Sequence, residues 1–202
     1  MSVALRAATY SDLEAVHPHL VAELIDGALV THPRPAPKHA VAASYMGMTI
    51  GPPFGHGSGG PGGWIIIGEP ELHFGSDVVV PDLAGWRKER LTSLPNKPYF
   101  ETAPDWVCEV LSPSTESYDR GPKRRIYARA GVSYLWLLDP RAELLETLVL
   151  RDGNWLLSET FSGADRVSAE PFDAISFPLS ILWPFSDVPS PGEESVEPTN
   201  DL

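Results

Sequence analysis

The middle of the chain constrains the fold most strongly, because it reads as a strand, a helix and a second strand in succession. Residues 105–111 form an apolar run that is interrupted by one internal acid. Residues 119–130 are predicted to form a helix that Asp119 caps and Gly131 closes. Residues 132–138 form a second apolar run with two aromatic side chains. A strand–helix–strand connection between parallel neighbours is right-handed, and this unit predicts an α/β protein with a mixed sheet flanked by helices.

The remaining elements are predicted from apolar runs and the turn residues between them. Apolar residues on both sides of an Asp-Gly pair predict a hairpin at residues 21–31. Residues 38–50 predict a helix whose apolar side carries Val41, Tyr45 and Met48, with Met46 as a further candidate. Further expectations are a short helix at residues 12–16 that Ser11 caps, a flexible Gly/Pro-rich loop at 51–63, strands at 64–67, 71–74, 78–80, 144–150 and 155–160, a polar excursion at 87–100 and an apolar patch at 175–183.

The length of 202 residues suits one domain with a full hydrophobic core. We expect that domain to span residues 1–185, followed by a disordered tail at 186–202 that is rich in Pro, Ser and acids. No apolar run reaches the roughly 18 residues that cross a membrane, so no membrane partner is expected. The single cysteine, Cys108, cannot form an internal disulfide, which favours a reducing, cytoplasmic location.

The charge balance is acidic, with a net charge of −12 from 15 basic and 27 acidic residues. Proteins that bind nucleic acid through charge alone usually carry a basic surplus. Any nucleic-acid function therefore needs a local basic patch or metal ions. The helix predicted at residues 119–130 is the most basic segment, with Arg120, Lys123, Arg124, Arg125 and Arg129. A solvated helix surface explains these residues equally well.

Two carboxylates stand in apolar surroundings. Asp82 follows Val-Val-Val-Pro, and Glu109 lies inside the apolar run at residues 105–111. An ionised carboxylate in an apolar strand is costly unless it is paired, hydrogen-bonded or bound to a metal. Either acid alone is explained by exposure at a strand end or by a salt bridge. Two such acids on adjacent strands predict a site for a hard divalent cation such as Mg²⁺.

Five short segments carry a family pattern. They are residues 79–83 (Val-Val-Pro-Asp-Leu), 106–115 (Trp-Val-Cys-Glu-Val-Leu-Ser-Pro-Ser-Thr), 118–123 (Tyr-Asp-Arg-Gly-Pro-Lys), 127–132 (Tyr-Ala-Arg-Ala-Gly-Val) and 134–140 (Tyr-Leu-Trp-Leu-Leu-Asp-Pro). In this order they resemble the Uma-two family (Uma2) of bacterial restriction endonucleases, within the PD-(D/E)XK nuclease superfamily. The resemblance spans about residues 8–183 and includes Glu-Leu-Ile-Asp-Gly at residues 23–27.

The resemblance implies a restriction-endonuclease-like fold with a site built on Asp82, Glu109 and Lys123. Asp82 and Glu109 would be the metal-binding acids, with Val110 as a further member of the metal site. The superfamily places a lysine two residues after the second acid, where this chain has Leu111. In this family a lysine on the next helix takes that place, and Lys123 is the matching residue.

Weaker candidates for the same site come from other predicted elements. Glu23 and Glu71 are acids near predicted strands that could complete the metal shell, and Glu69 competes with Glu71 for that role. His39 is interpreted as a first-helix site residue or, more simply, as a packing or surface histidine. Tyr127 lies four residues after the candidate lysine, on the same face of the helix.

Together these residues predict metal-dependent hydrolysis of DNA phosphodiester bonds. Mg²⁺ or Mn²⁺ on Asp82 and Glu109 would polarise the phosphodiester and lower the pKa of a bound water. Lys123 would steer that water or offset charge that develops on the phosphate. Two alternatives stay open: a catalytically silent module that binds nucleic acid or a protein, and a structural domain in which the acids pair with Arg124 or Arg125. A homodimer is expected of an enzyme that cuts two strands.

Overall fold

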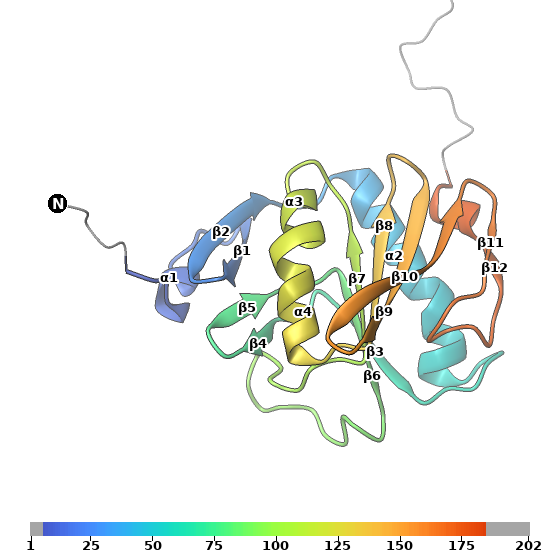
Figure 1. The fold of residues 1–202 in the computed structure, drawn as a ribbon, viewed down its shortest axis with the longest axis horizontal. Coiled ribbons are helices and arrows are strands. Elements are labelled where there is room, and N and C mark those ends of the chain that lie inside the picture. The colour runs from blue at the N-terminus through green and yellow to red at the C-terminus, as the bar shows by residue number, and fades with distance from the viewer. Residues whose placement is uncertain (1–5, 185–202) are drawn as a thin grey trace, which may run out of the picture.

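A six-stranded mixed sheet forms the centre of the computed structural model, which describes residues 6–184 (Figure 1). Its strand order is β10-β9-β8-β7-β6-β3, where β7 and β8 are parallel and the other neighbours are antiparallel. The predicted parallel strand–helix–strand unit is therefore confirmed. The strands are β3 (Trp64–Gly68), β6 (Leu83–Arg87), β7 (Trp106–Val110), β8 (Tyr134–Asp139), β9 (Leu144–Arg151) and β10 (Asn154–Ser162).

A helical connection joins β7 to β8 and packs on one face of this sheet. It consists of α3 (Glu116–Tyr118), the π-helical segment Asp119–Lys123 and α4 (Arg124–Ala130). Gly131 ends it in the left-handed conformation, at φ 80°, as predicted. The helix begins earlier than expected, so Asp119 lies inside it and is buried rather than capping it. Pro122 within the wider π turn explains the irregularity, because its ring lacks an N–H and excludes a regular α-helical bond.

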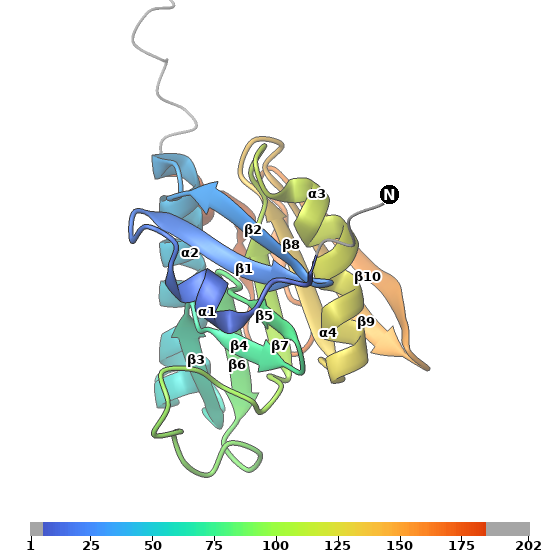
Figure 2. The same cartoon turned by 90° about the vertical axis from the view of Figure 1, so that its left-hand side faces the viewer.

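A second, four-stranded sheet has the order β2-β1-β5-β4. Asp26 and Gly27, both at positive φ, make the turn of the β1–β2 hairpin, which confirms the predicted hairpin. Figure 2 shows this hairpin in front of the larger sheet, between α2 and α4. The preceding helix begins earlier than predicted, because Thr9 rather than Ser11 caps it. The elements are α1 (Tyr10–Glu14), β1 (Leu20–Ile25), β2 (Ala28–Pro33), β4 (Leu72–Phe74) and β5 (Asp77–Val79).

Helix α2 (Pro37–Ile50) covers the other face of the larger sheet, with a different side buried from the predicted one. The buried residues are His39, Ala42, Met46 and Ile50, while Tyr45 and Met48 are exposed. Apolar residues occur on several sides of this helix, so their periodicity alone could not show which side meets the sheet. The chain then continues as a π-helical segment, Gly51–His56, that buries Phe54 where a flexible loop was expected.

The hydrophobic core lies on both faces of the larger sheet. Trp106, Cys108 and Val110 of β7 face α2, while Val107 faces α4, as alternation along a strand requires. Strand β6 was not predicted, although it pairs with β7 on one side and with β3 on the other. The C-terminal part of the described chain closes the core with β11 (Arg166–Val167), β12 (Phe177–Pro178) and the 3₁₀ helix Leu179–Leu182.

Two further expectations concern the tail and a membrane-spanning segment. The proposed tail at residues 186–202 lies outside them. Within residues 6–184, the structure has no helix that is both long and apolar enough to cross a membrane.

Candidate active site

Asp82 directly precedes β6, and Glu109 lies on the neighbouring strand β7 of the larger sheet. Strands β6 and β7 pair with Leu83 opposite Cys108, so the residue before Leu83 stands at the position opposite Glu109. Facing residues of an antiparallel pair project to the same side of the sheet, with Cβ atoms roughly 5 Å apart. Both carboxylates line one cavity of about 510 Å³. The structure therefore brings the two predicted acids into one site.

Asp82 is oriented by two neighbours. Its Oδ2 accepts a hydrogen bond of 2.7 Å from the main-chain N–H of Val110, and its Oδ1 lies 3.3 Å from Nε2 of His39. Burial lowers the pKa of His39, but the hydrogen bond and the charge of Asp82 outweigh it and hold the pKa above its usual value. Nδ1 of His39 is buried without a hydrogen-bond partner among residues 6–184. His39 is thus a site residue rather than a surface histidine.

Glu109 is buried and faces the helical connection. Its Oε1 lies 2.8 Å from Nζ of Lys123 and accepts a hydrogen bond from the hydroxyl of Tyr127. Burial raises the pKa of Glu109 well above its usual value; Lys123 opposes this effect, while Asp119 and Asp82 add to it. The carboxyl group therefore holds a proton more tightly than an exposed glutamate does.

Lys123 is the centre of a buried charge cluster. Besides Glu109, its ammonium lies 3.2 Å from Oε1 of Glu23 and 3.2 Å from Oδ1 of Asp119. Burial lowers the pKa of Lys123, but the negative groups Glu109 and Glu23 outweigh it and raise the pKa well above its usual value. An ammonium has three donors, and three carboxylates surround this one. Lys123 is therefore held as a charged group despite its burial.

The helical connection positions its three site residues through their spacing. Asp119, Lys123 and Tyr127 follow at intervals of four, which places them on one face of a helix. That face lies over β7, whose Glu109 points toward it. The basic neighbours face elsewhere: Arg125 contacts Asp26 at 3.2 Å on the surface. Pairing of the site acids with Arg124 or Arg125, one of the alternatives from the sequence, is not what the structure contains.

Glu23 joins the hairpin to the site. It comes from β1, accepts a hydrogen bond of 2.8 Å from the N–H of Val80, and lies 3.2 Å from Nε2 of His32. Burial raises the pKa of Glu23, but Lys123 and the hydrogen-bond donors outweigh it, so the pKa stays below its usual value. Glu23 is thus the acid beside Lys123 whose pKa is lowered, which suits it as the counter-ion of the ammonium.

Glu69 and Glu71, between which the sequence did not decide, both line the cavity. Glu69 has a positive φ of 48°, and its N–H donates to the main-chain oxygen of Asp82. Oε1 of Glu71 accepts a hydrogen bond of 2.8 Å from the hydroxyl of Tyr10 and lies 2.7 Å from Nε2 of His73. Burial and the hydrogen bond to Glu71 raise the pKa of Tyr10 to about 12.

Asp119 is the site residue that sequence analysis missed as such, because it was interpreted as a helix cap. It is buried, and burial raises its pKa despite the ammonium beside it. The signal was present in the sequence, since an acid four residues before a lysine on a helix forms an ion pair readily.

The donor groups suit a hard divalent cation. Among residues 6–184, no three or more His, Cys, Asp or Glu side chains converge as a complete metal site. Two facing carboxylates, supplemented by a main-chain oxygen, water and substrate, are nevertheless the set that Mg²⁺ commonly uses. Around the one buried ammonium, Lys123, the buried acids Glu23, Glu109 and Asp119 are in excess, and a cation would add positive charge to this cluster.

Three comparisons with known proteins agree with this architecture. The model of the Uma2 family, described as "Putative restriction endonuclease", matches residues 7–180. A crystal structure from Anabaena variabilis, described as "a putative nuclease belonging to DUF820", superposes on this chain with a TM-score of 0.70. That match covers 87% of this chain and 97% of the other at 21% identity, so it shows the fold. An uncharacterized protein of Synechocystis sp. is 36% identical over 86 residues, which are 42% of this chain and 44% of that protein.

Proposed function

The chain belongs to the Uma2 family, and on that premise we propose that it is a metal-dependent endonuclease that hydrolyses DNA phosphodiester bonds. The observation that carries the proposal is the cavity in which Asp82 faces Glu109 while Lys123 lies 2.8 Å from Glu109. A two-carboxylate site with an adjacent ammonium suits the hydrolysis of a phosphodiester, because the reaction needs a held cation and compensation of charge on the phosphate.

In this proposal, Asp82 and Glu109 hold Mg²⁺ or Mn²⁺. Val110, which follows Glu109, orients Asp82 through its main-chain N–H. When bound, the cation would polarise a phosphodiester oxygen and lower the pKa of a coordinated water. His39 orients Asp82 from the side of α2. Tyr127 orients Glu109 from the side of α4.

Lys123 acts first on Glu109. Its positive charge opposes the effect of burial on the pKa of that carboxyl, and so favours the ionised form that a cation requires. Because Glu109, Glu23 and Asp119 face its three donors, Lys123 reaches a phosphate oxygen only after one of these contacts opens. Glu23 and Asp119 are accordingly residues that position Lys123.

Cleavage of supercoiled plasmid DNA with Mg²⁺ or Mn²⁺ tests the proposal. We expect the wild-type protein to nick or linearise the plasmid and Asp82→Asn to leave it intact. Asp173→Asn is the matched control, because Asp173 is exposed and far along the chain from the site. We also expect the cation to raise the Tm of the wild type and of Asp173→Asn, but not of Asp82→Asn, since a bound ligand stabilises the folded state. Wild-type protein that leaves the plasmid supercoiled would contradict the proposal.

One observation favours a second function, a catalytically silent module that binds nucleic acid or a protein. The chain carries a net charge of −12, which disfavours an extended DNA surface. The same assays separate the two: this module would bind its partner without cleavage and without any effect of Asp82→Asn.

The number of copies and the cellular compartment follow as further proposals. Residues 6–184 carry one site of this kind, so two copies are needed to cut both strands together, and a homodimer should appear in light scattering after size exclusion. A cytoplasmic location agrees with a single cysteine in the sequence.

A further inference from the structure

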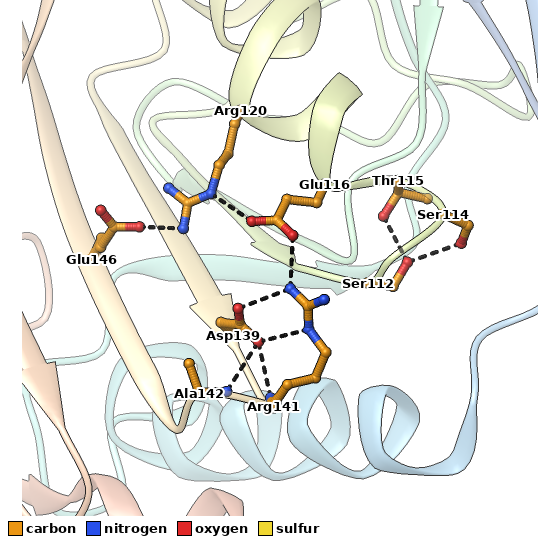
Figure 3. A network of polar contacts seen from close by, with 9 residues as sticks. All are labelled: Ser112, Ser114, Thr115, Glu116, Arg120, Asp139, Arg141, Ala142 and Glu146. Atoms are coloured by element: carbon orange, nitrogen blue, oxygen red, sulfur yellow. Dashed lines mark hydrogen bonds and ion pairs between the residues drawn. The ribbon is translucent and has the colours of Figure 1, made fainter.

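The loop that follows β7 presents three hydroxyl groups to the cavity. We call Ser112, Ser114 and Thr115 the hydroxyl loop; all three line the cavity together with Asp82 and Glu109. The Oγ of Ser112 lies 3.0 Å from the Oγ of Ser114 and 2.9 Å from the Oγ1 of Thr115, as Figure 3 shows. Hydroxyl groups can rotate to donate to an incoming oxygen atom. The proposed hydrolysis does not use them.

The hydroxyl loop is held in place from behind by an ion-pair network (Figure 3). Glu116, which follows the loop directly, lies 2.7 Å from Arg141 and 3.1 Å from Arg120. Arg141 also contacts Asp139 at 3.0 Å, and Arg120 contacts Glu146 at 2.6 Å. These charged groups satisfy one another away from the cavity. The loop therefore offers neutral donors at a fixed place.

One basic side chain also lines the cavity. Arg34, in the segment between β2 and α2, is exposed there. One of its Nη atoms donates to the main-chain oxygen of Pro18 at 3.1 Å, which leaves other donors of the guanidinium. His17 lines the cavity as well. Hydroxyl donors and a guanidinium are the groups that proteins use on nucleic-acid phosphates.

A smaller hollow of about 320 Å³ adjoins the cavity at Asp82. It shares Asp82, His39, Glu69 and Pro35 with the cavity, and residues of α2 line it. A strand that places one phosphate at Asp82 therefore has space in the cavity and in the hollow. The hydroxyl loop lines the cavity but not the smaller hollow, so it belongs to one end of this path.

We propose that the hydroxyl loop binds the phosphate adjoining the scissile phosphate of a nucleic-acid strand in the cavity that Arg34 also lines. This inference rests on the proposed function, because it takes the phosphate at Asp82 as the reacting one. The contact gives the strand its register in the cavity. It serves binding rather than the chemical step, so its loss should raise KM and leave kcat nearly unchanged.

The test compares Ser112→Ala/Ser114→Ala with Ser117→Ala, a matched control whose exposed hydroxyl lies in the same connection and does not line the cavity. Binding of a fluorescent DNA duplex is measured by anisotropy with Ca²⁺ in place of Mg²⁺, over a series of salt concentrations. We expect the double variant to bind about tenfold more weakly at every salt concentration, because neutral hydrogen bonds release no counterions. Arg34→Gln should instead reduce the salt slope by about one.

Two measurements keep this test decisive. The single variant Ser114→Ala, at an exposed position, should show a smaller loss and guards against misfolding of the double variant. A stabilising effect of Mn²⁺ on Tm that is equal in all variants shows that the cation site is intact. If wild type binds the duplex and the double variant binds as tightly as Ser117→Ala, the inference is overturned while the proposed function stands. If wild type binds no duplex, the proposed function fails and the inference fails with it.

Discussion

Replacement of Lys123 with Met tests whether its buried ammonium holds the site together. The side chain is 4% exposed, and its Nζ lies within 3.2 Å of carboxylates from Glu23, Glu109 and Asp119. Methionine has a similar length and flexibility but no charge, so the variant removes the ion pairs and leaves most of the packing. The carboxylates then stay buried without their common counter-ion.

The expected loss follows from that burial. Removing one partner of a buried ion pair costs about 3–5 kcal/mol, because the other charge is left uncompensated. For a chain of this length that corresponds to a fall in Tm of roughly 10 °C. Part of the loss should return in the double variant Lys123→Met/Glu23→Gln, because Glu23 is the acid whose pKa the ammonium keeps below its usual value.

The assay is urea unfolding at pH 7, followed by tryptophan fluorescence. Arg125→Met is the matched control on the same helix: its ion pair with Asp26 is 3.2 Å long, but its side chain is 61% exposed. A surface pair of this kind contributes at most about 1 kcal/mol. If Lys123→Met unfolds at the same urea concentration as Arg125→Met, the buried cluster does not carry the charges that the structure assigns to it.

Three further predictions concern the same site and the core beside it. Because burial raises the pKa of Glu109 above its usual 4.5, the folded metal-free chain keeps a proton that the unfolded chain releases; the free energy of unfolding should therefore fall as the pH rises above about 4.5, and Glu109→Gln should remove that slope in a pH series of urea midpoints. Tyr127→Phe should lower the free energy of unfolding by about 1–3 kcal/mol, because it removes one of the two buried donors beside Oε1 of Glu109, and an unchanged midpoint would show that the hydroxyl contributes nothing. Gly85→Ala should cost about 1–3 kcal/mol in the same assay, because its Cβ would lie 3.2 Å from Trp106 and 3.3 Å from Trp64, whereas Gly121→Ala, whose Cβ meets nothing within 4 Å, should not share this loss.

Most of the architecture could be predicted from local signals. The Asp-Gly turn at residues 26–27, the glycine at 131 and the apolar runs on either side of helix 119–130 each act within a few residues, and the structure confirms the elements that they predict. Strand β6 was missed because Leu-Ala-Gly-Trp-Arg is short and contains a glycine, which weakens a strand pattern. Its pairing between β3 and β7 stabilises it instead.

The candidate site was only partly predictable, because its residues come from elements that meet only in the tertiary structure. Asp82, Glu109 and Lys123 were expected together because of the acids in apolar runs and the family resemblance, and the structure places all three at one cavity; their catalytic roles stay predictions. His39 was left between a site residue and a packing or surface histidine, because histidines are commonly of intermediate burial. Asp119 was interpreted as a cap, because nothing local to residue 119 shows that Glu23 and Glu109 approach the lysine that follows it.

The sequence by itself determined most of the segments that become strands and helices, and that two carboxylates stand where an apolar strand does not favour them, because turn residues and side-chain alternation act over short distances. Only the tertiary structure decided which groups meet. Glu23 comes from the hairpin, His39 from α2, Asp82 from the residue before β6, Glu109 from β7, and Lys123 from the crossover helix. Their contacts depend on the order of strands in the sheets and on which face of each helix is buried, and packing across the whole chain settles both.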